Sequence, residues 1–212
     1  MHPLITPALL AEALTYPAYR ALADARFLEG RTTSADPRFN TPQYLEYAAL
    51  NRKRMNRLEK VPPLDPATVA TAQTLARPLT ALVLTESWCG DAAQTVPVLH
   101  RIAEASAGRL ALRLLLRDEH PALMDAFLTT GSRSIPKLIL LDPATLTVLG
   151  TWGPRPAPAH TQVQADLAAG VSYEERSTKL HTWYAHDKTL TTQVEVRALL
   201  MAVGGAGAVV TG

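Results

Sequence analysis

The sequence has a single cysteine, Cys89, among its 212 residues. A lone cysteine excludes an internal disulfide framework and suits a reducing compartment such as the cytoplasm. It also excludes zinc sites built from several cysteines, and the six histidines are scattered without the spacing of metal ligands. We therefore expect neither a bound metal nor a cofactor.

Strong net charge and long apolar runs are also lacking. The formal net charge of +2 is too small to argue for nucleic-acid binding. No stretch reaches the ~18 consecutive apolar residues of a membrane-spanning helix, and residues 1–15 lack the features of a signal peptide. With 47% hydrophobic and 19% charged residues, the composition indicates a globular chain with a core. We expect a cytoplasmic protein with no nucleic-acid and no membrane partner.

Strand and helix patterns alternate through the middle of the sequence, as in an α/β domain. The predicted strands span 79–85, 110–116, 137–141 and 146–152. The predicted helices span 91–107, 121–128 and 157–168. The first two strands are nearly continuous apolar runs, which is typical of strands covered on both faces.

The flanks of this segment are helical in pattern. Thr41 and Pro42 form an N-cap and a first-turn proline for a long helix that ends at Pro62. A second helix opens at Asp65, and two more follow from Ser172 onward. We divide the chain into an N-terminal helical extension (1–76), an α/β core (77–170), a C-terminal helical extension (171–203) and a flexible tail (204–212).

Cys89 lies where the first strand ends and the next helix begins. Free backbone N–H groups and the positive end of the helix dipole favour a thiolate at this position. A lone cysteine is more often a small buried apolar residue. The small and polar neighbours Ser87, Gly90 and Asp91 favour a thiol that is at least partly exposed.

Residues 88–92, Trp-Cys-Gly-Asp-Ala, resemble the Trp-Cys-Gly-Pro-Cys site of thioredoxins. Pro97 matches the proline that kinks the thioredoxin active-site helix, and residues 130–140 resemble the segment that carries the thioredoxin cis-proline. With its flanking residues 44–57 and 183–187, the chain is similar to a bacterial single-cysteine thioredoxin-like family with helical extensions.

The resemblance implies a thioredoxin-like fold, a four-stranded mixed sheet flanked by helices, with additional N- and C-terminal helices. The expected strand order is 2-1-3-4 with an antiparallel last hairpin. The bond between Ile135 and Pro136 is expected to be cis and to face Cys89, so that the Ile135 backbone meets the substrate. An ordinary trans proline at the start of an edge strand is the alternative.

Ala92 stands at the place of the second thioredoxin cysteine, so Cys89 has no internal partner. A mixed disulfide on Cys89 must be resolved by an external thiol. We therefore expect the partner to be a low-molecular-weight thiol or a cysteine of another protein. Trp88 either shields one side of the sulfur or simply packs.

Asp91 places a like charge near a Cys89 thiolate. At ~7 Å, this repulsion of about 1 kcal/mol nearly cancels the helix-end stabilisation, so we expect only modest acidification. Arg54 and Arg57 lie three apart on one helical face, where they are suited to offset Asp91 or to bind a substrate carboxylate. The alternative is that this basic run is a solvated helix face.

The sequence leaves two alternative functions for the chain. The first is a monothiol thiol–disulfide oxidoreductase with Cys89 as nucleophile, supported by Trp88, Gly90, Asp91 and the Ile135-Pro136 bond. The second is a catalytically silent thioredoxin-fold module that recognises a protein partner.

Overall fold

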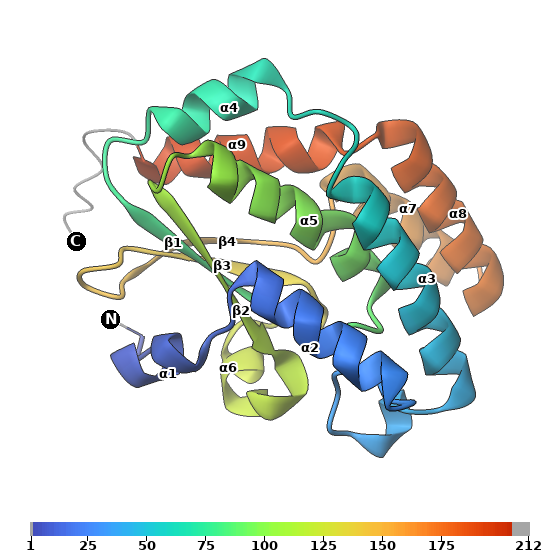
Figure 1. Cartoon of the computed structure of the whole chain (residues 1–212). Helices are drawn as coiled ribbons and strands as arrows, with labels where there is room; N and C mark the ends of the chain where they lie inside the picture. The colour runs from blue at the N-terminus through green and yellow to red at the C-terminus, as the bar shows by residue number, and fades with distance from the viewer. Residues whose placement is uncertain (1, 205–212) are drawn as a thin grey trace.

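The computed structural model describes residues 2–204 of the chain. Within this range, a four-stranded mixed sheet is surrounded by helices (Figure 1). The strands are β1 (Leu79–Thr85), β2 (Leu110–Leu116), β3 (Lys137–Leu141) and β4 (Val148–Trp152). The helices are α1 (Pro7–Glu12), α2 (Tyr16–Leu28), α3 (Pro42–Leu58), α4 (Pro66–Gln73), α5 (Gly90–Ala105), α6 (Pro121–Ala126), α7 (Ala157–Ala168), α8 (Tyr173–Asp187) and α9 (Leu190–Gly204), with 3-10 turns η1 (Pro37–Phe39) and η2 (Arg117–Glu119).

The sheet has the strand order β2-β1-β3-β4. β1 runs parallel to β2 and antiparallel to β3, and β3 runs antiparallel to β4. Every residue of β1 and β3 is buried, as expected for central strands covered on both faces. The predicted strand order and the antiparallel last hairpin are confirmed.

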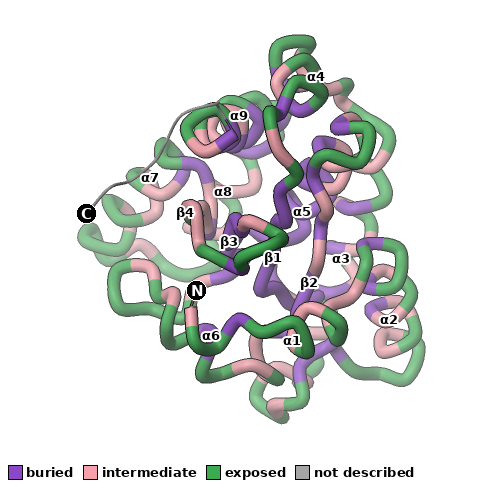
Figure 2. The backbone as a smooth tube through the Cα atoms, turned by 90° about the vertical axis from the view of Figure 1, so that its left-hand side faces the viewer, coloured by how far each residue is buried: buried purple, intermediate pink, exposed green. Residues whose placement is uncertain are grey.

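Helices cover both faces of the sheet. Figure 1 shows α4, α5 and α9 together on one face, with α1 and α6 on the opposite side. Figure 2 shows that the buried segments gather in the strands and in α5, which lies on one face of the sheet. α9 approaches β4 closely, because a Cβ at Gly150 would lie 2.7 Å from Leu199 Cδ1. The C-terminal extension therefore packs directly on the sheet.

The N-terminal extension covers the outer edge of the sheet. Leu14 forms an antiparallel bridge with Leu114 of β2, with N···O distances of 2.8 and 2.9 Å in the two directions. An edge strand paired in this way presents fewer free N–H and C=O groups to another chain. Gly204, where the predicted tail begins, is the last residue of α9, and residues 205–212 lie outside the described part.

Several predicted boundaries differ from the structure. β4 begins at Val148 because Leu146 has a left-handed backbone conformation (φ 56°) that a strand does not adopt. α3 ends at Leu58, before the predicted end at Pro62. Thr41 is the N-cap of α3 as predicted, but its side chain makes no capping hydrogen bond.

In residues 2–204, no helix has both the length and the apolar character needed to span a membrane.

Candidate active site

Cys89 lies between the start of α5 and the loop before β3. It is the N-cap residue of α5, and its Sγ accepts a hydrogen bond from the Ala92 N–H at 3.5 Å. On its other side, Sγ lies 3.2 Å from the carbonyl oxygen of Ile135, to which the thiol donates. β1 and β3 are antiparallel neighbours, so the residues after β1 face those before β3. The Ile135–Pro136 bond is cis, which confirms the prediction.

The Cys89 thiol is buried, with 7% of its surface exposed. Burial raises the pKa of Cys89 to about 12, and the Asp91 carboxylate adds to this shift. The N–H groups of Ala92 and Asp91 and the Arg155 guanidinium oppose it only in part. The predictions of a partly exposed and modestly acidified thiol are therefore wrong. They compared the stabilisation of the thiolate by the helix end with its repulsion by Asp91. They left out desolvation, which has the largest effect on the pKa of Cys89.

Asp91 is buried and forms an ion pair with a partly buried residue far along the chain. Arg155, in the loop between β4 and α7, donates to Asp91 Oδ2 from Nε at 3.0 Å and from a terminal nitrogen at 2.6 Å. The hydroxyl of Tyr184 on α8 donates to Oδ1 at 2.7 Å. Asp91 thus joins α5, the β4–α7 loop and α8 in one network.

Arg155 is the residue that forms an ion pair with Asp91. Arg54 interacts with the Asp91 charge without an ion pair, and its predicted role in offsetting Asp91 stays a prediction together with that of Arg57. Arg54 does lie at this end of the site, with a terminal nitrogen 3.8 Å from where a Cβ at Gly90 would be. It donates to Asn51 Oδ1 at 2.8 Å, and burial lowers the pKa of its guanidinium. Arg57 is exposed, three residues further along α3. A substrate-binding role for Arg54 and Arg57 stays a prediction.

α3 is fixed to the loop that carries the cysteine. The buried Asn51 donates from Nδ2 to the Ser87 carbonyl at 2.9 Å while its Oδ1 accepts from Arg54. Both ends of the Asn51 amide are therefore used, which is the condition for burying such a group without a large cost.

Trp88 packs flat against a residue of the N-terminal extension. Its ring stacks on Phe39 with centroids 4.4 Å apart and an angle of 3° between the planes. The Arg117 guanidinium carbon lies 4.8 Å from the Trp88 centroid and 4.9 Å from that of Phe39, a cation–π arrangement. Tyr44 meets Trp88 edge-on at 5.6 Å. Trp88 therefore packs in an aromatic wall beside the sulfur.

Gly90 is enclosed by a histidine of the C-terminal extension. A Cβ at this position would lie 2.9 Å from both Cε1 and Nε2 of His181 on α8. Burial lowers the pKa of His181 to about 4, so the ring is neutral near pH 7. The glycine allows α8 to approach the start of α5 this closely.

Glu86, the residue after β1, is a buried carboxyl group that the sequence did not single out. It accepts hydrogen bonds from the Thr33 hydroxyl and, at 3.1 Å, from the Asp118 N–H. Burial raises its pKa to about 7. Thr33 also exchanges two hydrogen bonds with Ser87, at 3.0 and 2.8 Å. The loop after α2 is thereby attached to the residues just before Cys89.

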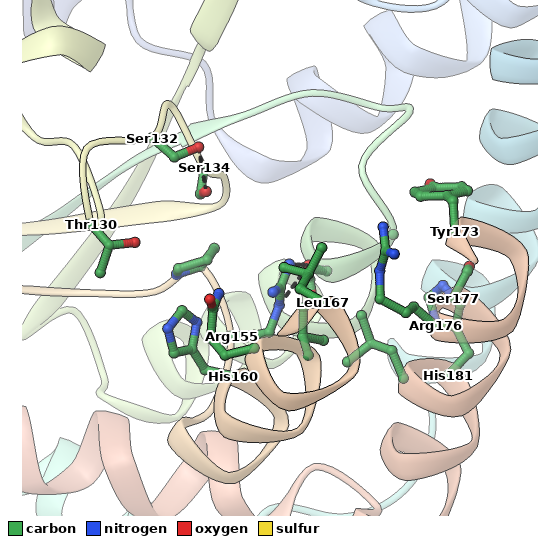
Figure 3. A pocket seen from close by; sticks show the side chains of 16 residues that line it. Thr130, Ser132, Ser134, Arg155, His160, Leu167, Tyr173, Arg176, Ser177 and His181 are labelled. Atoms are coloured by element: carbon green, nitrogen blue, oxygen red, sulfur yellow. Dashed lines mark hydrogen bonds and ion pairs between the residues drawn. The ribbon is translucent and has the colours of Figure 1, made fainter. Parts of the chain in front are cut away.

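Two adjoining cavities surround the start of α5. The first, of about 360 Å³, is lined by Cys89, Trp88, Ile135 and the aromatic wall. The second, of about 390 Å³, lies against α7 and α8 (Figure 3). Six residues line both cavities, which makes them two lobes of one cleft: Gly90, Asp91, Ser132, Ser134, Arg155 and Tyr173. In residues 2–204, no group of three His, Cys, Asp or Glu side chains is placed to hold a metal ion.

The fold and the site define a thioredoxin-fold protein with one buried cysteine at the start of α5. Ala92, at the place of a second cysteine, is 2% exposed. The family model described as thioredoxin matches residues 39–168, so the chain belongs to this family.

Solved structures show the same fold. A protein of unknown function from Pseudomonas aeruginosa is 18% identical, with a TM-score of 0.52 over 88% of this chain and 97% of its own. An HIV epitope-scaffold is 17% identical, with a TM-score of 0.52 over 88% of this chain and 98% of its own. No curated protein matches the sequence.

The sequence did not predict the ion pair of Arg155 with Asp91 or the hydrogen bond from Tyr184 to Asp91. It also did not predict the two lobes of the cleft. Arg155 lies in the run Gly-Pro-Arg-Pro (153–156), and such a run indicates a turn but says nothing about the distant partner of its arginine. Tyr184 belongs to the segment that carried the family resemblance. The helical spacing of Tyr184 favours a buried side chain, but it does not indicate that the hydroxyl contacts a carboxylate.

Proposed function

We propose that the protein is a monothiol thiol–disulfide oxidoreductase with Cys89 as its nucleophile. The position of the sulfur supports this most directly. Sγ lies at a cleft wall between the N–H of Ala92 and the carbonyl of Ile135. A substrate chain alongside Ile135 would bring its own sulfur to Cys89, and the helix end would stabilise the attacking thiolate.

The proposed reaction has two exchange steps. The Cys89 thiolate attacks the small-thiol sulfur of a mixed disulfide and forms a new S–S bond to it. The old S–S bond breaks, and the released protein thiolate takes up a proton. A second small thiolate then attacks the sulfur attached to Cys89, giving the small-thiol disulfide and restoring Cys89. In the net reaction, one free small thiol is oxidised into the small-thiol disulfide, and the protein sulfur of the mixed disulfide is reduced to a thiol.

The second exchange step needs an external thiol because the chain has no other cysteine. The protein should therefore reduce mixed disulfides with small thiols better than a disulfide within another protein. A cytoplasmic location, where such thiols are kept reduced, fits the single cysteine.

The second candidate function is a thioredoxin-fold module that binds a protein partner without redox chemistry. The raised pKa of Cys89 is the observation that favours it, because the resting thiol is protonated near pH 7. For the enzyme to act, substrate binding must lower this pKa. The binding module needs no such change.

Turnover of a mixed disulfide between glutathione and a peptide separates the two functions. The assay uses several small thiols in turn as the reductant and compares the wild type with Cys89→Ser, which is nearly isosteric. The oxidoreductase predicts turnover in the wild type and loss of turnover in Cys89→Ser. Equal inactivity of both proteins with every reductant would overturn the proposal and leave the binding module.

A further inference from the structure

We infer that the α7–α8 lobe of the cleft is a binding site for the carboxylate-bearing body of a small acidic thiol, with Arg176 as the anion-binding residue. This inference deepens the proposed function and rests on it for the role of the bound thiol. It concerns the cavity of about 390 Å³ between the 130–134 loop, α7 and α8 (Figure 3).

The two lobes have the size and connection that such a ligand needs. Each cavity falls within the range of about 300–1,000 Å³ typical of small-molecule sites, and they share the wall around Asp91 and Arg155. A ligand with its sulfur at Cys89 in the first lobe can extend its body past Gly90 into the second.

The charge of the walls favours an anion. Four arginines line the two lobes, Arg117, Arg133, Arg155 and Arg176. Among the described lining residues of both lobes, Asp91 is the single acidic side chain, and it is already bonded to Arg155 and Tyr184. A carboxylate entering the cleft therefore meets an excess of positive charge.

Arg176 differs from the other three arginines in its partners. Arg117, Arg133 and Arg155 each pair with an aspartate. Within residues 2–204, Arg176 has no carboxylate within the 4.0 Å of an ion pair, and its bond goes to the Val171 carbonyl. The half-buried guanidinium keeps further N–H groups for a ligand. A carboxylate supplies the bidentate charge-assisted hydrogen bonds that this group lacks.

Neutral polar groups complete the lobe. Ser132 and Ser134 line both lobes, and Gln164 and Ser177 line the second beside Arg176. Amide and hydroxyl groups at these places suit a peptide-like body. One unpaired arginine matches the single charge of a carboxylate better than the two charges of a phosphate.

Binding of S-methylglutathione to the full chain tests the inference. This thioether carries two carboxylates and one ammonium, which leave a single net negative charge. It cannot exchange, so its binding is independent of redox turnover. Calorimetry should show that it binds the wild type at least about tenfold more tightly than S-methylcysteamine, which is cationic. Arg176→Gln should weaken the binding of S-methylglutathione by about tenfold, and Arg176→Lys by less, because a lysine keeps the charge without the planar fork.

Lys53→Gln is the matched control, since it removes one positive charge from an exposed position of α3 outside both lobes. Its affinity should equal that of the wild type. The inference is overturned if S-methylglutathione does not bind, or if both Arg176 variants bind it as tightly as the wild type. Either result leaves the turnover assay unaffected. If S-methylglutathione binds but the mixed disulfide is not turned over, the proposed oxidoreductase function is rejected and the binding site at Arg176 is retained.

Discussion

Cys89 is held in a protonated state by its surroundings. Its thiol donates to Ile135, and burial raises its pKa to about 12 although the end of α5 favours the thiolate. In the proposed exchange, Cys89 must therefore lose its proton within the cleft. Of the charged neighbours, Asp91 raises the Cys89 pKa and Arg155 lowers it, with Asp91 the stronger of the two.

Asp91→Asn should lower the pKa of Cys89 and speed its alkylation at neutral pH. The variant should also lose about 1–3 kcal/mol of stability, because Arg155 and Tyr184 lose their charged partner. The measurement is the rate of iodoacetamide labelling across pH, together with urea unfolding.

Asp24→Asn serves as the control for this experiment, since Asp24 pairs with Arg52 at a more exposed place. It should leave the labelling rate unchanged. An unchanged or raised Cys89 pKa in Asp91→Asn would show that Asp91 acts on the thiol mainly by holding Arg155 in place.

Both helical extensions take part in the cleft. The N-terminal extension supplies Phe39, Tyr44 and Tyr47 to the lobe of the cysteine, and α8 supplies Tyr173 to both lobes. α8 also reaches the buried carboxylate of Asp91 through Tyr184. The extensions therefore belong to the site in structure, although they flank the core in sequence.

Tyr184→Phe tests the connection between α8 and the active-site helix. A hydrogen bond to a charged and buried carboxylate contributes about 1.5–3 kcal/mol, and we expect a loss of stability of this size. Tyr173→Phe, at a position that is 52% exposed, should change stability by less than about 0.5 kcal/mol. Urea unfolding measures both. Equal stability of Tyr184→Phe and the wild type would mean that this bond does not fasten α8 to α5.

The sequence predicted the elements of the core well because their signals are local. The apolar runs of β1 and β2 and the position of Cys89 before α5 required no knowledge of distant residues. The family resemblance supplied the strand order and the cis Ile135–Pro136 bond. Arg155 and Thr33 could not be assigned to the site, because the contacts of Arg155 with Asp91 and of Thr33 with Glu86 arise only when the chain folds. The burial of Cys89 was missed for the same reason.

Glu86 connects the N-terminal extension to the centre of the sheet. Its carboxyl group accepts from Thr33 in the loop after α2 and from Asp118 after β2. It is fully buried in the folded chain, where its pKa is about 7 against an ordinary value of 4.5. The folded chain therefore binds this proton more strongly than the unfolded chain.

The stability of the whole molecule should consequently depend on pH through Glu86. The protonated Glu86 contributes to the free energy of unfolding, and this contribution is fully present below about pH 4.5. It is lost as the pH rises through about 7, a change of roughly 3 kcal/mol. Glu86→Gln, which imitates the protonated acid, should remove this part of the pH dependence and be more stable than the wild type at pH 8. Thermal unfolding from pH 5 to 8 measures the difference. Parallel curves for the two proteins would contradict the assignment.

In the proposed reaction, Cys89 exchanges with a mixed disulfide and holds the small thiol as a covalent intermediate. Intact mass spectrometry can detect this intermediate after the protein is mixed with a glutathionylated peptide and quenched in acid. We expect release of the peptide thiol, one glutathione attached to Cys89, and loss of that adduct when free glutathione is added. Cys89→Ser should acquire no adduct. Unmodified wild-type protein together with unreduced peptide would show that Cys89 does not act as the nucleophile.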